Sequence, residues 1–445
     1  MPGKLGPISV STKQQRIAEL ARQMPEKAMT SLSHHMDLEW MIEAYRRTRK
    51  DGAVGIDGQT GQDYALDLEA NLHSLLDRAK SGDLYKAPMV RRVHIPKADG
   101  TTRPLGITTF EDKVLQRAVI MAMEPIYEHD FMDCSYGFRP ERSAHHAIEA
   151  IRSRLLKMGG GFVLDVDIRR YFDSLNHTHL RDFLAKRMRD GVITRLIGKW
   201  LSAGVMDAGC IFHPETGTPQ GGVASPLLAN IYLHEVLDVW FEKEVKPRLR
   251  GLGFLVRYAD DFVMGFTYEE DARKVLDVLP KRFGKYGLEL HPDKTRMLDF
   301  RSPRYRIATK DKDGPGSFSF LGFTFYWAKS LKGNWVVKQK TSKKSFTKAL
   351  QSIREWCRSN RHLPLKEQQQ TLTQKLKGHY AYFGLPGNSS CLGGFCHEVK
   401  EEWWKWLKRR SQAGYMSWLD FCRLLDRYPL PRPVMRHRIL IVANP

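Results

Sequence analysis

Residues 254–266 read FLVRYADDFVMGF, and this stretch decides the fold prediction. Its two apolar runs, 254–256 and 262–266, are typical of buried strands, and the short polar segment between them predicts a tight hairpin turn. The turn carries adjacent carboxylates, Asp260 and Asp261. Like charges this close repel each other, and a divalent cation would relieve the repulsion. A plain surface hairpin with an Asp-Asp turn is the alternative, and this pair alone does not exclude it.

A second apolar stretch, FVLDVDI at residues 162–168, also carries acids. Asp165 and Asp167 are two residues apart and therefore share one face of a strand. Acids in an apolar strand cost several kcal/mol unless they are paired or bind a metal. Mg²⁺ prefers oxygen ligands, and two ions about 3.5–4 Å apart clamp both oxygens of a phosphoryl transfer. If the two stretches are neighbouring strands, Asp167 and the hairpin acids form such a site.

Charge indicates the kind of partner. The chain has 445 residues, with 71 Lys and Arg against 50 Asp and Glu, for a net charge of +21. Residues 331–445 hold 22 basic and 7 acidic side chains. This excess favours a polyanion, because neutralised phosphates release counterions; a solvated basic face is the alternative. The six cysteines form no CxxC pair, and no apolar run predicts a signal peptide or a membrane span, so we expect a cytoplasmic protein.

Several segments in order resemble the reverse transcriptases. Residues 258–261 (YADD) resemble their YxDD box, residues 167–173 their first catalytic segment, and residues 218–222 (TPQGG) the segment between these two. Further matches narrow the resemblance to the enzymes encoded by bacterial group II introns and their relatives; these are residues 55–58, 103–107, 116–118, 135–140 and 320–323. Several ordered motifs are far more specific than one short motif.

The resemblance implies an α+β fold of the right-hand polymerase type, with fingers, a palm built on an antiparallel sheet, and a helical thumb. It implies an N-terminal extension at residues 1–80, fingers and palm at 81–325, and a basic thumb or maturase-like region at 326–445. The implied activity is RNA-directed DNA polymerisation with two Mg²⁺ ions. The implied partners are an RNA template, a DNA or RNA primer and dNTPs.

Residue roles follow from the same resemblance. Asp167, Asp260 and Asp261 are the expected catalytic metal ligands, with the backbone carbonyl of Ile168 as a further ligand. Asp165 fits a variable, accessory position. The residues expected at the incoming nucleotide are Lys97, Arg103, Phe172, Gln220 and Lys294, and those expected to position the primer end are Phe320, Leu321 and Gly322.

Phe172 and the basic C-terminal region each have a plainer interpretation. Phe172 would exclude a ribose 2′-OH, although a Phe in an apolar segment is more often core. Trp403, Trp404 and Trp406 would stack on bases, yet their spacing cannot turn all three the same way, so at least one should be buried. The safer candidates for phosphate contacts are the basic residues beside them, Lys405, Lys408, Arg409 and Arg410.

Two departures and three alternatives remain open. Thr108 stands where the family usually has Pro, and Lys113 where it usually has Arg, which puts template contact there in doubt. The sequence offers no candidate for the family's C-terminal nuclease, which puts autonomous bottom-strand DNA cleavage in doubt. The alternatives to polymerisation are a maturase-type splicing cofactor for structured intron RNA, a host defence or repair enzyme of the same descent, and a plain RNA-binding module.

The secondary-structure expectations are coarse. We expect a hairpin at 91–107 and a strand at 318–326. The helices are expected at 111–130, 142–158, 178–203, 226–246, 269–287 and from 341 onward, with a break at 384–394. The change from mixed α/β to basic helical sequence predicts a domain boundary near residue 330.

Overall fold

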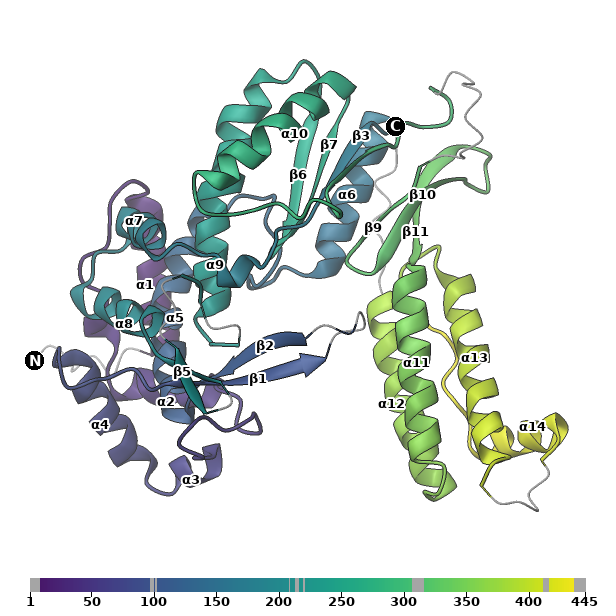
Figure 1. Ribbon diagram of the computed structural model, residues 1–445, viewed down its shortest axis with the longest axis horizontal. Coiled ribbons are helices and arrows are strands. Elements are labelled where there is room, and N and C mark those ends of the chain that lie inside the picture. Colours follow the sequence, from purple (N-terminus) through teal and green to yellow (C-terminus); the bar gives the residue numbers. More distant parts are fainter. Residues whose placement is uncertain are drawn as a thin grey trace, which may run out of the picture. The chain divides into compact units, whose positions relative to one another are not determined.

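The computed structural model describes residues 9–96, 100, 102–207, 209–212, 216–218, 221–305, 316–410 and 416–435. The chain divides into two compact units (Figure 1). The first comprises Met1–Ala147 and Leu164–Met297, and the second comprises Ile148–Val163 and Leu298–Pro445. Within the described residues, no helix has the length and apolar character needed to cross a membrane.

The N-terminal part of the first unit is a helical layer around α5. Trp40 is fully buried and donates its indole N–H to the carbonyl of Ala118 in α5 at 2.9 Å, which ties α2 to α5. The helices of this layer are α1 (Val10–Gln23), α2 (Leu38–Arg47), α3 (Gly61–Ala65), α4 (Leu68–Lys80) and α5 (Phe110–Asp130), followed by the start of α6 (Ala144–Met158).

A small sheet of order β2-β1-β4-β5 adjoins this layer. Its antiparallel hairpin, β1 (Val90–Pro96) with β2 (Thr102–Ile107), confirms the hairpin predicted at 91–107. The other two strands, β4 (Val205–Asp207) and β5 (Cys210–Phe212), are antiparallel to each other, and β4 runs parallel to β1.

The second sheet carries the predicted carboxylates and has the strand order β6-β7-β3-β8. β6 (Gly253–Tyr258) and β7 (Asp261–Phe266) form the predicted antiparallel hairpin, with Tyr258 opposite Asp261. β3 (Phe162–Val166) lies between β7 and β8 (Arg296–Asp299). Helix α10 (Glu269–Gly284) packs along β7 (Figure 1).

The prediction of one continuous helix at 178–203 was wrong. It is two helices, α7 (His177–Arg187) and α8 (Gly191–Leu201). Asp190 separates them because its carboxylate accepts the backbone N–H groups of Val192 and Ile193, which caps α8. The predicted helix at 226–246 likewise begins as α9 (Ser225–Leu233) and then widens into π turns at His234–Asp238 and Phe241–Val245.

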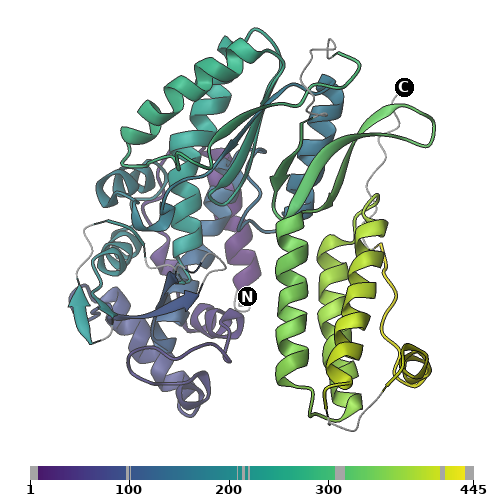
Figure 2. The same ribbon diagram turned by 45° about the vertical axis from the view of Figure 1, so that its right-hand side comes forward.

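The second unit contains a three-stranded sheet and a helical bundle. The antiparallel sheet comprises β9 (Phe318–Phe320), β10 (Phe323–Lys329) and β11 (Trp335–Thr341). The bundle comprises α11 (Lys343–Ser359), α12 (Leu365–Phe383), α13 (Ser389–Leu407) and α14 (Trp418–Arg427). Figures 1 and 2 show α11, α12 and α13 side by side, around a core that includes Leu376 and Trp403.

Two expectations in this unit need correction. The strand predicted at 318–326 is interrupted at Leu321 and Gly322, which both have positive φ, so the chain turns back on itself between β9 and β10. The break predicted at 384–394 is shorter than expected. Helix α13 already begins at Ser389 and includes the two glycines at 393 and 394, because packing of its apolar face outweighs their low helix propensity.

Candidate active site

The turn of the β6–β7 hairpin presents two carboxylates. Asp260 lies in the turn and Asp261 begins β7, while Ala259 adopts the left-handed region with φ of 57°. That backbone conformation is uncommon for a residue with a side chain and points to a turn held by its surroundings. The side chain of Asp260 is partly buried, and that of Asp261 reaches solvent.

The neighbouring strand brings two further carboxylates. Asp165 lies in β3 and Asp167 directly follows it, on the strand adjacent to β7. Each carboxylate meets one cation: Asp165 accepts from Arg296 at 3.0 Å, and Asp167 from the ammonium of Lys294 at 2.8 Å. The structure therefore pairs Lys294, predicted at the nucleotide, with one of the predicted metal ligands.

Electrostatics couples these carboxylates. Partial burial, then the charges of Asp260, Asp167 and Asp165, raises the pKa of Asp261 to about 7, although Lys294 opposes the shift. Burial and the charge of Asp167 also raise the pKa of Asp260, against the opposing charges of Arg103 and Arg257. Such mutual repulsion is what a bound divalent cation would relieve.

The donor set fits a hard cation. Carboxylate oxygens are the ligands that Mg²⁺ prefers, and Mg²⁺ usually takes only one or two carboxylates together with substrate phosphates. Across the described part of the chain, no three His, Cys, Asp or Glu side chains converge as a ready-made cation cage. Ile168 forms an antiparallel bridge with Leu290. In this bridge the carbonyl of Asp167 accepts the backbone N–H of His291 at 2.8 Å. Because successive carbonyls alternate along a strand, the carbonyl of Ile168 points to the opposite side.

Phe172 adjoins the segment that carries the PQG motif. Its side chain is 8% exposed and packs edge-on against Tyr171 at 5.4 Å between ring centroids. Its carbonyl accepts the backbone N–H of Thr218 at 2.8 Å. Gly221 lies against β2, where an added Cβ would come within 2.7 Å of the Gly106 carbonyl. The predicted nucleotide contact Gln220 lies outside the described residues.

The β1–β2 hairpin carries the remaining nucleotide candidates. Arg103 is exposed on β2, and its charge is near enough to Asp260 to oppose the rise in the pKa of that carboxyl. Lys97 lies outside the described residues. Of the five predicted nucleotide contacts, the structure thus places Arg103, Phe172 and Lys294 in the unit that carries the carboxylates.

A buried network below the PQG segment was missed in the sequence. Gln116 accepts the backbone N–H of Ala224 at 3.0 Å and donates to Asp112 at 2.8 Å. Trp200 and Tyr85 also donate to Asp112. Burial raises the pKa of Asp112 to about 6, despite these hydrogen bonds.

A small cavity adjoins this network. Its volume is about 20 Å³, room for one water molecule. The buried hydroxyls of Thr108 and Thr218 line this cavity, and neither has a hydrogen-bond partner among the described residues. A water molecule in the cavity would satisfy both. Thr108 is therefore buried in the lining of this cavity.

The primer candidates lie in the second unit, at the turn between β9 and β10. Phe320 is buried, and Leu321 adopts a φ of 48°. Two contacts hold the turn: the hydroxyl of Tyr382 donates to the Leu321 carbonyl at 2.9 Å, and the N–H of Ser342 donates to the Gly322 carbonyl at 2.8 Å. Strain held in this way is typical of functional turns.

The tryptophans near the end of α13 divide as expected. Trp403 is fully buried and donates to Gln368, so base stacking is wrong for this residue. The ammonium of Lys408 lies 3.9 Å from the ring centre of Trp404, and the guanidinium of Arg409 lies 5.2 Å from that of Trp406. These two rings are covered by cations of the same helix end.

The other predicted RNA contacts differ in their surroundings. The Lys405 ammonium lies 3.7 Å from Glu402, which offsets part of its charge. Arg410 lines an open hollow of about 630 Å³, and the other lining residues are Arg358, Ser359, Arg361 and His362. No acidic side chain lines this hollow among the described residues.

The chain belongs to the reverse transcriptase (RNA-dependent DNA polymerase) family, whose model matches residues 95–325. It is 37% identical to protein YkfC of Escherichia coli over 58% of this chain and 76% of that protein. It is 36% identical to the group II intron-encoded protein LtrA of Lactococcus lactis, over 48% of this chain but only 37% of LtrA. It is 28% identical to nuclear intron maturase 2 of Arabidopsis thaliana, over 65% of this chain and 46% of that protein.

These matches confirm the predicted enzyme class, an RNA-directed DNA polymerase resembling those of group II introns, and the α+β right-hand polymerase fold. Nucleic acid is accordingly its partner. The roles of the individual site residues remain predictions.

Proposed function

We propose that Asp167, Asp260 and Asp261 hold two Mg²⁺ ions and that this chain copies RNA into DNA at that site. The observation that carries the proposal is the placement of these carboxylates on adjacent strands, where burial and then their mutual repulsion raise the pKa of Asp261 to about 7. When bound, the ions supply charge stabilisation for the attacking and leaving oxygens of nucleotide transfer. The backbone carbonyl of Ile168 is a further candidate ligand.

The surrounding side chains have separate roles in this proposal. Arg103 and Lys294 bind the triphosphate, because cations stabilise its developing charge. Lys97 and Gln220 are proposed contacts of the same nucleotide. Phe172 excludes a ribose 2′-OH, and the Phe320–Gly322 turn positions the primer end.

Lys294 also forms an ion pair with Asp167. The 2.8 Å contact neutralises part of the carboxylate charge. With Asp167 engaged by a metal ion, the Lys294 ammonium would be available to phosphate oxygens. Lys294→Gln should therefore weaken dNTP binding while it leaves the carboxylates intact.

A primer-extension assay tests the proposal. Wild-type protein should extend oligo(dT) on poly(rA) with dTTP and Mg²⁺, and Asp260→Asn should abolish extension. Asp277→Asn is the matched control, because Asp277 is an exposed carboxylate in the middle of α10. Extension that survives in Asp260→Asn, or that is lost equally in the control, would overturn the assignment.

We further propose that the basic C-terminal region binds structured RNA through Lys405, Lys408, Arg409 and Arg410. The hollow that Arg410 shares with Arg358 supports this, because its lining includes arginines, whose guanidinium groups pair well with phosphate. An intron RNA would use the same chemistry, so a maturase-type splicing role is the second candidate. A splicing assay separates the two, since Asp260→Asn should retain splicing while it loses polymerisation.

The cellular compartment is part of the proposal. All six cysteines are free in the structure, and three of them are buried. Free thiols are usual where the surroundings are reducing, so we propose a cytoplasmic setting.

A further inference from the structure

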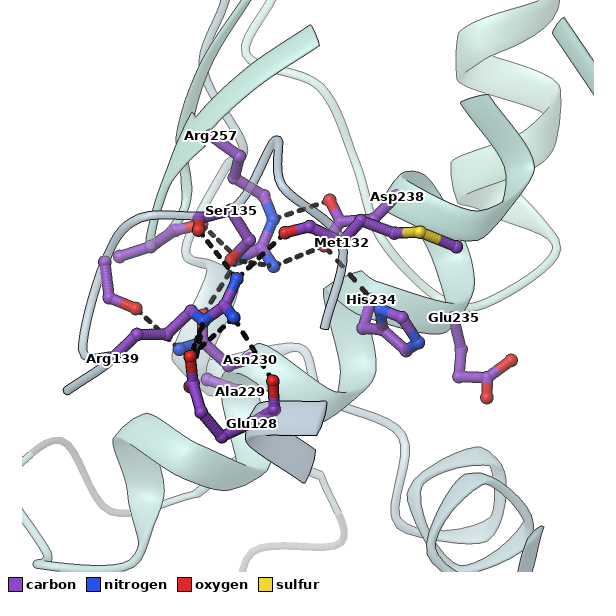
Figure 3. Close-up of polar contacts among 12 residues, drawn as sticks. Glu128, Met132, Ser135, Arg139, Ala229, Asn230, His234, Glu235, Asp238 and Arg257 are labelled. Atoms are coloured by element: carbon purple, nitrogen blue, oxygen red, sulfur yellow. Dashed lines mark hydrogen bonds and ion pairs between the residues drawn. The ribbon is translucent and has the colours of Figure 1, made fainter. Parts of the chain in front are cut away.

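Arg257 is a fully buried cation directly behind the turn that carries Asp260 and Asp261. All of its hydrogen-bonding capacity is used, since a guanidinium has five N–H donors and makes five hydrogen bonds here. Two of them form a bidentate pair with Asp238, at 2.8 and 2.6 Å. Figure 3 shows this pair and the bond to Ser135.

One of the five bonds reaches the turn itself. The Nη1 group of Arg257 donates to the carbonyl of Ala259 at 3.0 Å, and also to Asn230 at 2.9 Å. Ala259 is the residue with positive φ immediately before Asp260. The guanidinium therefore connects a rigid buried anchor, Asp238, to the one peptide whose orientation sets the direction of the following carboxylates.

The opposite side of the turn is in contact with a second segment. An added Cβ on Gly137 would lie 2.3 Å from the Ala259 nitrogen, so only glycine allows this approach. The same segment donates from Tyr136 to the Arg257 carbonyl at 2.9 Å. Asn230 donates to the Gly137 carbonyl at 2.7 Å and so links the two sides.

The π turn at His234–Asp238 explains how one helix supplies both partners. In a continuous α-helix, Asn230 and Asp238 would be about 80° apart around the axis, because eight residues overshoot two turns. A π turn takes up the extra residue, which brings the two side chains to one face. Both then reach the same guanidinium (Figure 3).

A buried ion pair is weak as a source of stability, because removing two charges from water offsets most of their attraction. Its fixed geometry is a better account of why it lies here. We propose that Arg257, anchored by Asp238, is a positioning residue that holds the Ala259–Asp260 peptide so that Asp260 and Asp261 face the metal site. This inference rests on the proposed function, because it assumes that these carboxylates bind metal.

Two variants test it from opposite sides. Arg257→Lys removes the bidentate pair and the fixed direction toward Ala259. Gly137→Ala leaves the ion pair in place and displaces the turn by contact, so it keeps the test decisive if Arg257→Lys folds poorly. Gly198→Ala is the matched control, because an added Cβ there meets nothing within 4 Å.

Three readouts separate positioning from mere folding. Both variants should exchange amide hydrogens faster across the peptide 254–266, and both should bind Mn²⁺ roughly 10- to 100-fold more weakly by electron paramagnetic resonance, the usual loss when a partner of a metal ligand is removed. The Mg²⁺ concentration that half-saturates primer extension should rise by a similar factor. Gly198→Ala should leave all three unchanged.

The outcomes are distinct for the two proposals. Variants that lose folded fraction but keep wild-type Mn²⁺ affinity and half-saturating Mg²⁺ would show that the Arg257 network only stabilises the fold, and the inference would be wrong. If Asp260→Asn does not weaken Mn²⁺ binding, the proposed metal role fails instead. Hydrogen exchange still decides in that case whether Arg257 orders the turn.

Discussion

Replacing Lys408, Arg409 and Arg410 with Gln should flatten the salt dependence of RNA binding. Removing one phosphate-binding side chain reduces the slope of log K against log salt by about 0.7–0.9, so the three substitutions together correspond to about 2–3 units. Lys405 is left in place because Glu402, 3.7 Å away, already offsets part of its charge. Between about 50 and 200 mM salt, wild-type protein should lose roughly 20- to 40-fold more affinity than the variant.

Fluorescence anisotropy with a labelled structured RNA, titrated at several salt concentrations, measures this slope. The control replaces Lys243, Lys274 and Lys281 with Gln, which removes the same charge from exposed positions of the first unit. Its slope should remain close to that of wild type. Thermal unfolding of both variants checks that removing the cation–π interactions at the end of α13 has not unfolded the bundle.

A slope unchanged by the triple substitution would refute the reasoning, because the phosphate-binding surface would then lie elsewhere. An equal decrease in the control would also refute it, since the effect would follow net charge alone. The test is sharp because the expected change is large compared with the scatter of a salt titration.

Three further predictions concern the polymerase unit and the primer turn. Phe172→Ala should lower the free energy of unfolding by about 3–5 kcal/mol and admit ribonucleotides. An unchanged rNTP-to-dNTP incorporation ratio would show that Phe172 serves only core packing. Burial raises the pKa of Asp112 to about 6, so the protonated acid favours folding; in urea denaturation, wild type should lose roughly 2 kcal/mol more stability than Asp112→Asn as pH rises from 4 to 6. Tyr382→Phe removes the bond to the Leu321 carbonyl, so it should cost about 1 kcal/mol in thermal denaturation and raise the KM for primer–template; an unchanged KM would separate this turn from primer binding.

The elements with strong local signals were predictable. Alternation and an Asp-Gly turn identify the β1–β2 hairpin, and two apolar runs around a polar turn identify β6 and β7. Where local signals conflict with tertiary contacts, the sequence misleads. The run at 318–326 is mostly apolar, yet hydrogen bonds from Tyr382 and Ser342 hold a turn inside it. The cap at Asp190 was also missed, although an Asp directly before a helix is a local signal; its other carboxylate oxygen accepts the distant backbone N–H groups of residues 32 and 33.

The candidate site divides along the same line. The types and order of the carboxylates are readable because acids in apolar strands require an explanation. What orients them is not readable. Arg257 follows an apolar run that is buried in the structure. A cation at such a position must pair with a buried carboxylate, so its position in the sequence was the available signal. Identifying Asp238 as that carboxylate requires the π turn, for which the sequence has no pattern.

Strained backbone marks the same places independently of any motif. Among the described residues, five with side chains have positive φ, and three of them lie at or near predicted site residues: Leu321 is one itself, Ala259 precedes Asp260, and Arg170 lies two residues before Phe172. Such conformations cost of order 1–3 kcal/mol each and persist only where other contacts enforce them. The hydrogen bonds that hold Ala259 and Leu321 come from side chains elsewhere in the fold. Because a relaxed turn would have folded more easily, the retained strain indicates that the direction of these peptides matters more than the stability they cost.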